Sequence, residues 1–181
     1  MVYGRRLIMK NFQITDKETD KKYWISRSIC TCIIPIVIYH GNIIGVLASK
    51  RGDKTPNEQG KWNLTCGYLD YDETTMECAQ RELWEELGLK IPLEKFQLYK
   101  IIDDPKKDWA QNVSFRYIVK LPLYEVLDYL HDSADLDSES RGGENSEVSD
   151  IRLILKEDLS KYNWAFNHLD LIHEVFNYLE S

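Results

Sequence analysis

The segment RELWEELG, residues 81–88, places three glutamates and one arginine in eight positions of a helical pattern. At 3.6 residues per turn, Glu82, Glu85 and Glu86 fall on one narrow arc of that helix. Beside this arc runs an apolar stripe typical of a core-facing surface, formed by Met76, Ala79, Leu83 and Leu87. The segment therefore predicts a helix with one side against a core and three carboxylates clustered beside that side.

The three carboxylates carry an electrostatic cost. Like charges three or four residues apart on a helix repel each other by roughly a few tenths of a kcal/mol per pair. Glu85 and Glu86 also lie near the C-terminal end of the helix, where the helix dipole disfavours negative charge. These residues alone leave two interpretations open, a solvated helix face or a divalent-cation site. The second would suit Mg²⁺ or Mn²⁺, because both prefer hard oxygen ligands.

The rest of the chain alternates between strand-like and helical segments. Strands are predicted where β-branched and aromatic residues dominate, at 23–40, 43–50, 61–65, 95–103, 111–121 and 148–155. Besides the acidic helix, 3.6-residue periodicity predicts a C-terminal amphipathic helix over about 165–180. Residues 122–132 fit either a strand or a short helix, and the acidic segment 133–147 is predicted to be a loop. This order predicts one α/β domain over residues 1–181.

Charge and hydropathy exclude several classes of partner. The net charge is −7 and the basic residues form no stripe, so bulk attraction to nucleic acid or to an anionic membrane is not expected. The longest apolar run, residues 32–39, is too short to span a bilayer and contains Pro35. The first twenty residues lack the apolar region of a secretion signal. We therefore expect a cytoplasmic protein with no membrane or nucleic-acid partner.

The chain has four cysteines, at positions 30, 32, 66 and 78. Cys30 and Cys32 lie two apart in a predicted strand, so their side chains share one face. A CxC pair can begin a zinc site, but no CxxC or His-rich segment follows at a familiar spacing. We therefore expect reduced, mostly buried thiols. His168 and His173 are predicted to be packing or capping residues of the last helix.

Residues 67–89, GYLDYDETTMECAQRELWEELGL, fill every fixed position of the pattern G-x5-E-x7-R-E-U-x-E-E-x-G-U, where U is aliphatic. This pattern is the Nudix box, and the chain resembles the Nudix hydrolases. The preceding GKWNLTCG resembles the G-x-W-x-x-P-G-G lead-in of that family. The resemblance covers about residues 26–162 and implies a Nudix-type α/β/α sandwich with a mixed sheet.

The resemblance implies a metal-dependent hydrolase that cleaves the pyrophosphate bond of a nucleoside diphosphate linked to another group. Water would attack a phosphorus atom with the help of Mg²⁺ or Mn²⁺. Carried over position by position, Glu82, Glu85 and Glu86 are the expected metal ligands, and Glu82 or Glu86 would also orient the water. A backbone carbonyl at Cys66 or Gly67 would complete the coordination.

Residues around the acidic arc are expected to play supporting roles. Glu73 and Arg81 are expected to form an ion pair that fixes the loop against the helix, with an incidental surface pair as the alternative. The general base is expected just before the last strand, at Glu144 or Glu147, where a solvated acidic loop is the alternative. Residues that could contact phosphates or a ring, or be ordinary surface, rim or core residues, are Arg27, Arg51, Lys61, Tyr68, Tyr71 and Trp109.

Thr65 and Cys66 stand where many family members carry proline and glycine. We expect the Cβ atom of Cys66 to come close to the metal side of the site. A nucleophilic cysteine is conceivable there, but metal-activated water makes one unnecessary. This departure bears on the substrate more than on the type of reaction.

Two other functions are conceivable for a chain with this pattern. A nucleotide-sensing or regulatory domain could keep this fold without turnover, but such domains usually lack one or more box glutamates. An isomerase acting on an isoprenoid diphosphate would need dedicated catalytic residues that the sequence does not place. Homodimer formation is compatible with the sequence, which does not identify the substrate.

Overall fold

The sheet is built on its longest strand, β3 (Ile29–Tyr39). In the computed structural model, which describes residues 11–106, 111–134 and 147–181, β3 runs parallel to β8 (Val113–Pro122) along almost its whole length. On its other edge β3 pairs antiparallel with two strands in turn. Its first half pairs with β6 (Thr65–Tyr68) and its second half with β4 (Asn42–Arg51). β3 thus connects β6, the strand that precedes the first helix, to the rest of the sheet.

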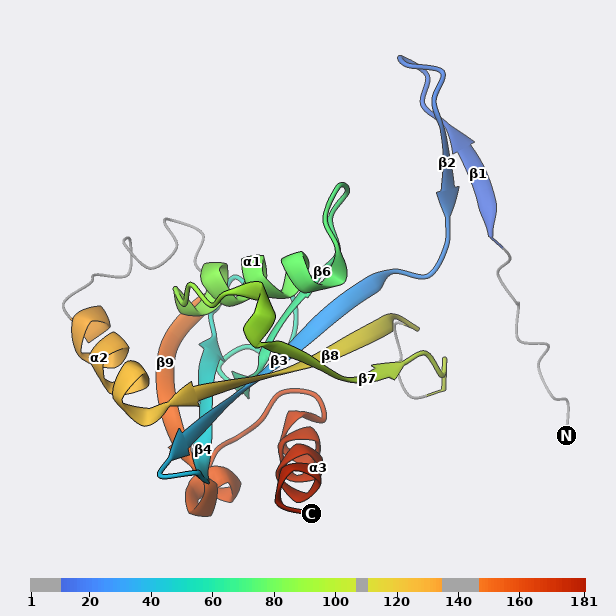
Figure 1. Ribbon diagram of the computed structural model, residues 1–181. Coiled ribbons are helices and arrows are strands. Elements are labelled where there is room, and N and C mark those ends of the chain that lie inside the picture. The colour runs from blue at the N-terminus through green and yellow to red at the C-terminus, as the bar shows by residue number, and fades with distance from the viewer. Residues whose placement is uncertain (1–10, 107–110, 135–146) are drawn as a thin grey trace, which may run out of the picture.

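Three further strands complete the sheet. β7 (Phe96–Ile102) pairs antiparallel with β8, while β5 (Trp62–Asn63) and β9 (Val148–Leu155) pair antiparallel with β4. The result is a mixed sheet of seven strands among the described residues. A separate two-stranded hairpin, β1 (Phe12–Thr15) and β2 (Lys22–Ile25), projects away from the body (Figure 1).

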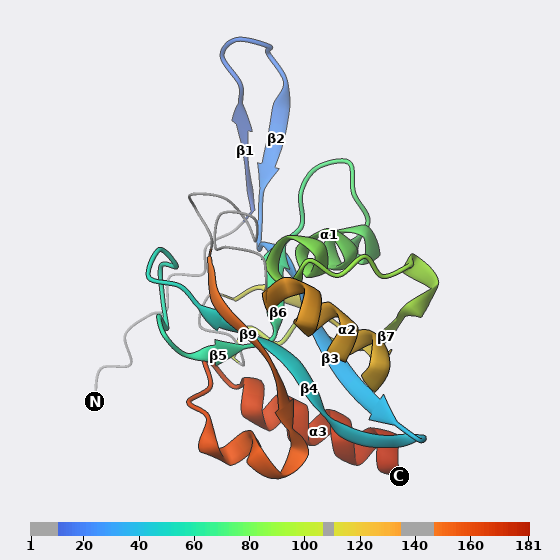
Figure 2. The same ribbon diagram turned by 90° about the vertical axis from the view of Figure 1, so that its left-hand side faces the viewer.

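Helices cover both faces of the sheet. α1 (Thr75–Leu87) and α2 (Leu123–Ala134) lie on one face, and α3 (His168–Glu180) lies on the other, as Figures 1 and 2 show. Short 3₁₀ helices at Leu93–Lys95 and Lys156–Lys161 connect to β7 and follow β9. The expected α/β/α sandwich is therefore confirmed, and the C-terminal helix supplies its third layer.

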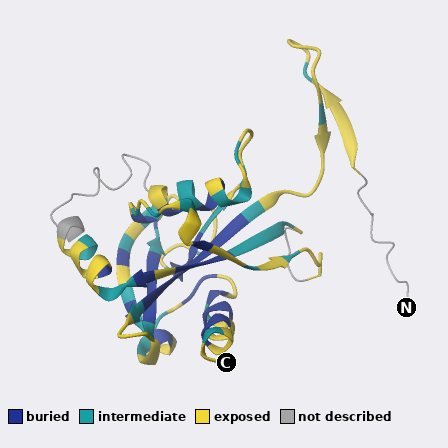
Figure 3. Ribbon diagram, viewed as in Figure 1, coloured by how far each residue is buried: buried dark blue, intermediate teal, exposed yellow. Residues whose placement is uncertain are grey.

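The two cores follow from the alternation of side chains along β3. Ile33 and Val37 point to the face covered by α1, whereas Ile34 and Ile36 point to the face covered by α3. All four are fully buried, which explains why this strand reads as a nearly continuous apolar run. Buried residues concentrate on the central strands and on the inner side of α3 (Figure 3).

Local signals set both ends of α1. Thr74 and Glu77 form a capping box, in which each side chain accepts a hydrogen bond from the backbone N–H of the other residue. Gly88 adopts the left-handed conformation (φ 70°) and its N–H donates to the Trp84 carbonyl at 2.8 Å. Ala79, Leu83 and Leu87 are buried, as the apolar stripe predicted.

The structure decides one segment that the sequence left ambiguous and differs from the sequence-based expectation in two others. The ambiguous segment 122–132 is helical from Leu123 onward and forms most of α2. α3 begins at His168, because Phe166 adopts a left-handed backbone (φ 53°) that a helix excludes. The first strand of the hairpin was missed, because the strands predicted from the sequence begin only at residue 23. The apolar residues of β1 are exposed rather than packed on the core. Within the described ranges, no helix combines the length and apolar character needed to cross a membrane.

Replacing Thr74 by alanine tests the contribution of the capping box. We expect Thr74→Ala to lower the free energy of unfolding by about 1 kcal/mol, because the N–H of Glu77 loses its acceptor at the start of α1. Thr74→Ser retains the oxygen and should change stability much less. Urea denaturation of the three proteins measures both effects, and equal losses for Ala and Ser would contradict the assigned role of the hydroxyl.

Candidate functional site

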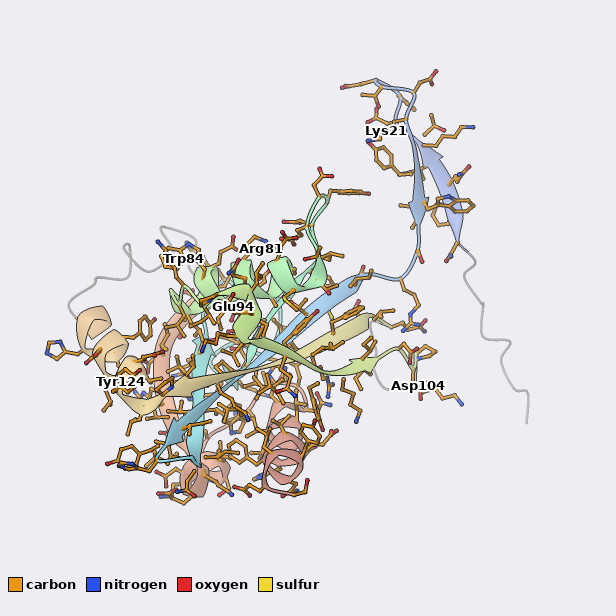
Figure 4. The ribbon with its side chains drawn as sticks, in the orientation of Figure 1. Lys21, Arg81, Trp84, Glu94, Asp104 and Tyr124 are labelled. Carbon is orange, nitrogen blue, oxygen red and sulfur yellow. The ribbon has the colours of Figure 1, made fainter. Side chains whose placement is uncertain are left out.

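Arg81, in the middle of α1, connects the helix to the loop that precedes it. Its guanidinium pairs with Glu73 (2.8 Å), Glu82 (2.7 Å) and Glu85 (3.0 Å). It also donates a hydrogen bond to the backbone carbonyl of Tyr68 at 3.0 Å. Figure 4 shows Arg81 on the upper side of α1, next to the loop that precedes the helix. The expected pair with Glu73 is present, and the same cation also offsets repulsion between two glutamates of the acidic arc.

Glu73 is the most firmly held of these carboxylates. Hydrogen bonds from Arg81 lower its pKa to about 2, and the backbone N–H of Asp70 adds to this effect. Glu73 in turn raises the pKa of Arg81 further above its ordinary value. Both groups are therefore charged throughout the physiological range, and the pair ties residues 68–73 to the helix.

Gly67 allows β6 and α1 to approach each other closely. A Cβ atom at Gly67 would lie 1.8 Å from the carboxylate carbon of Glu82, so no other residue fits without displacing that side chain. The requirement is for space, since the backbone of Gly67 is not left-handed. Burial between the helix and β6 raises the pKa of Glu82. The backbone of Gly67 and the carboxylate of Glu82 are thus adjacent, as a shared metal site would need.

Glu86 is the most deeply placed carboxylate of the arc. Its Oε1 accepts a hydrogen bond from the backbone N–H of Cys66, and its Oε2 accepts one from the Ser49 hydroxyl, both at 3.3 Å. Burial raises its pKa to about 8 despite these two donors. Ser49 is buried in β4 and also bonds Asn63 at 3.2 Å. Sequence reasoning missed Ser49, because its partner lies 37 residues away and no motif links the two.

This donor set fits a hard divalent cation. Glu82, Glu85 and Glu86 offer carboxylate oxygens along one arc of α1, and Glu85 is more than half exposed. Among the described residues, Glu86 is held by a hydroxyl and an amide rather than by a cation. Burial and neighbouring negative charge raise the pKa values of Glu82 and Glu86, which is the imbalance that a bound cation would relieve.

The two candidates for the general base differ in their standing. Glu144 lies outside the described residues. Glu147 lies directly before β9, where its carbonyl accepts a hydrogen bond from the N–H of Gly52 at 2.7 Å. Its negative charge contributes to the raised pKa values of Glu82 and Glu86. The fold therefore brings Glu147 within electrostatic reach of the acidic arc.

The basic candidates lie on two different segments. The guanidinium of Arg27 donates to the carbonyls of Gln111 and Asn112, beside the start of β8. Asn112 also donates a hydrogen bond to the hydroxyl of Tyr68 at 3.4 Å, so Arg27 and Tyr68 border the same loop. Tyr71 is exposed, and Trp109 lies outside the described residues.

Arg51 and Lys61 flank the loop between β4 and β5. Arg51 donates a hydrogen bond to the carbonyl of Asn57 at 2.9 Å, and its guanidinium lies 5.2 Å from the centre of the Phe166 ring. Lys61 pairs with Glu58 on the same loop. Both cations thus have local partners. Within the described residues, neither is among the groups that contact Glu82, Glu85 or Glu86.

Cys66 departs from the sequence-based expectation. Its side chain was expected near the metal side of the site, which is wrong. Its backbone N–H donates to Glu86 on the side of α1. Its sulfur lies on the opposite face of the sheet, 3.8 Å from Nε2 of His168. Side chains alternate across a strand, so Gly67 faces α1 and Cys66 faces α3. His168 is buried, as a packing residue should be.

The chain is similar in sequence to known proteins. The NUDIX domain model matches residues 33–175. Phosphatase NudJ of Escherichia coli K12 is 29% identical over 86 residues, which cover 47% of this chain and 53% of NudJ. NudJ of Shigella flexneri gives the same values. The chain thus spans about half the length of the curated relatives it matches.

Solved structures agree in fold at low sequence identity. The NUDIX domain of Shewanella oneidensis NrtR complexed with ADP ribose is 18% identical with a TM-score of 0.60, covering 86% of this chain and 90% of that one. A MutT/nudix protein from Enterococcus faecalis is also 18% identical, with a TM-score of 0.62 and coverage of 87% and 63%. A bifunctional NMN adenylyltransferase/ADP ribose pyrophosphatase from Francisella tularensis is 17% identical, with a TM-score of 0.56 and coverage of 85% and 42%.

The family model spans most of the chain and includes most of β3, the acidic helix and most of α3. Its match agrees with the complete box on residues 67–89 and with the sandwich formed around it. The chain therefore belongs to the Nudix family.

Proposed function

We propose that the protein hydrolyses the pyrophosphate bond of a nucleoside diphosphate linked to another group, with Mg²⁺ or Mn²⁺ as cofactor. The observation that carries this proposal is the gathering of Glu82, Glu85 and Glu86 beside the backbone of Gly67, where one arginine offsets only part of their charge. The NudJ relatives, which are named as phosphatases, support the same reaction class.

In this proposal the three glutamates hold the cation, and a backbone carbonyl at Gly67 or Cys66 completes its ligands. When bound, the cation supplies charge neutralisation at the pyrophosphate and acidifies water. Arg81 and Glu73 position the ligands by fixing the preceding loop against α1. Because Arg81 already contacts Glu82 and Glu85, it also limits their rotamers before the cation binds.

Proton transfer and water orientation fall to the remaining acidic groups. Glu82 or Glu86 orients the attacking water, and Ser49 with the Cys66 N–H holds the Glu86 carboxylate in place. Glu147 is the general-base candidate that the described structure supports, through its electrostatic effect on Glu82 and Glu86. Glu144 remains a candidate from sequence alone.

For the substrate, we propose to begin with ADP ribose. The NrtR domain was solved with this ligand and the Francisella protein is named as an ADP ribose pyrophosphatase. Contacts to phosphates or a base are proposed for Arg27, Arg51, Lys61 and Tyr68, which border the two loops described above. Arg51 and Lys61 would have to exchange local partners for a phosphate.

A nucleotide sensor that binds without turnover is the competing function. The complete set of box glutamates argues for turnover, because a sensor does not need three carboxylates that repel one another. The experiment below separates the two functions, because turnover and binding are measured on the same substrates.

Removing one carboxylate tests the metal-dependent reaction. The protein is incubated with ADP ribose, NADH, nucleotide sugars, dinucleoside polyphosphates and nucleoside triphosphates, with Mg²⁺ or Mn²⁺, and phosphate-containing products are followed. We expect turnover that EDTA abolishes. Glu85→Gln should lower kcat/KM by roughly 100-fold or more, because it removes a charged ligand at the reacting phosphates.

Glu94→Gln serves as the control, since Glu94 is an exposed glutamate on the 3₁₀ helix after α1. It should retain full activity. Tight binding of one substrate without turnover of any would favour the sensor. Equal activity in the wild type and Glu85→Gln would refute the assignment of Glu85.

The raised pKa of Glu86 predicts the pH dependence of stability in metal-free protein. The pKa of Glu86 is about 8 in the folded protein and 4.5, the ordinary value of a glutamate, in the unfolded chain, so the folded protein binds the extra proton between these values. The free energy of unfolding in EDTA should therefore fall as pH rises through this window. One pKa unit corresponds to about 1.4 kcal/mol, so the total effect should reach a few kcal/mol at most.

Glu86→Gln should flatten this dependence, because the amide cannot titrate. Mn²⁺ should stabilise the wild type more at pH 8 than at pH 6, because a ligating carboxylate must be ionised. Denaturant titrations at several pH values, with and without Mn²⁺, measure both effects. An unchanged slope in Glu86→Gln would show that another group causes it.

A further inference from the structure

Cys32 and Cys66 face each other across two neighbouring strands. They are direct partners in the antiparallel register of β3 and β6. Both side chains point to the face covered by α3, away from the box glutamates. Cys32 is buried, at 5% exposure, and Cys66 is half-buried. This pair is separate from the proposed metal site although one peptide bond links Cys66 to Gly67.

His168, the first residue of α3, completes the group. Its Nε2 lies 3.8 Å from the sulfur of Cys66, and one ligand atom from each of the three residues lies within 4.8 Å of the others. Its Nδ1 accepts a hydrogen bond from the backbone N–H of Leu64 at 3.0 Å. A neutral imidazole carries one proton, so this bond assigns the proton to Nε2. His168 therefore presents an N–H donor to the sulfur atoms.

This tautomer distinguishes two uses of the group. The spacing alone would suit a soft metal, because zinc bound by sulfur and nitrogen separates these ligands by about 3.6–3.8 Å. A metal on Nε2, however, would need the proton on Nδ1, where the N–H of Leu64 already donates. Metal binding would thus leave a buried backbone donor without its acceptor. An N–H directed at sulfur instead suits a thiol that develops negative charge.

We propose that Cys32 and Cys66 form a redox-active dithiol, which a hydroperoxide converts into a cross-strand disulfide. The more exposed Cys66 reacts first: its sulfur attacks the O–O bond and becomes a sulfenic acid, while the leaving oxygen takes the thiol proton and departs as an alcohol or water. The sulfur of Cys32 then displaces the hydroxyl, which leaves as water with the second thiol proton. Two thiols are oxidised and one hydroperoxide is reduced.

Strand geometry selects this pair among the four cysteines. Directly opposed residues of antiparallel strands have Cα atoms about 4.5–5.5 Å apart, inside the range of about 4.4–6.8 Å that disulfides span. Cys30 is a diagonal neighbour of Cys66, and such neighbours lie about 7–8 Å apart. Cys78 belongs to α1 and contacts Thr31 on the other face of the sheet.

Peptide mapping tests the proposal independently of any hydrolase activity. The reduced full chain is treated with hydrogen peroxide, its remaining thiols are blocked with N-ethylmaleimide, and it is digested with trypsin without reductant. Cleavage after lysine and arginine places Cys32 in peptide 28–50 and Cys66 in peptide 62–81. We expect these two peptides to be linked with the loss of two hydrogens, and the linkage to disappear after reduction.

Cysteine variants locate the bond. Cys32→Ser and Cys66→Ser should each abolish the linkage, whereas the double variant Cys30→Ser, Cys78→Ser should retain it. If buried Cys78 does not tolerate serine, fragmentation of the linked wild-type peptides identifies the bonded pair. Linkage through Cys30 or Cys78, or oxidation that adds oxygen without linking the peptides, overturns the proposal. So does equimolar zinc that stays with the reduced protein through gel filtration and is lost in Cys32→Ser.

Discussion

The guanidinium of Arg81 is the contact on which the acidic site depends. α1 carries carboxylates that repel one another, and the loop before it has no secondary structure to fix it. Arg81 pairs with Glu73 in that loop and with Glu82 and Glu85 on its own helix, and it also bonds the Tyr68 carbonyl. One delocalised cation with several N–H donors can satisfy all four directions at once, whereas a lysine could not. The loop, the helix and β6 consequently meet at one residue.

β6 separates two kinds of chemistry because its side chains alternate. Gly67 faces α1, where the absence of a side chain admits the Glu82 carboxylate. Cys66, one residue earlier, sends its sulfur toward α3 and His168 while its N–H reaches Glu86. The carboxylate oxygens of α1 thus lie on one face of the sheet, and the sulfur atoms of Cys32 and Cys66 lie on the other. A change at Cys66 can reach the acidic site through the backbone N–H that holds Glu86.

Elements with strong local signals were predicted well. The apolar stripe of α1 extends over a few turns, so its spacing suffices to predict the helix, and the caps seen in the structure, Thr74 and Gly88, act equally locally. The apolar run of β3 was also recognised, because burial on both faces leaves it continuous, but the strand predicted over 23–40 is divided in the structure between β2 and β3. The hairpin β1–β2 was not predicted, since its apolar residues are exposed and no core periodicity marks them. The direction of the Cys66 side chain was predicted wrongly, because a motif gives position along the chain but not the face of the sheet.

The sequence by itself determined the acidic helix, the family pattern and the carboxylates of the proposed cation site. These depend on residues within one segment, 67–89, whose spacing along a helix and its leading loop places them. Only the tertiary structure decided which distant groups join them. Ser49 and Glu147 approach the glutamates, and Cys32 meets Cys66 and His168, through strand register and helix packing. Such contacts join residues tens of positions apart, and the pairing that creates them is set by how the whole core packs rather than by any local pattern.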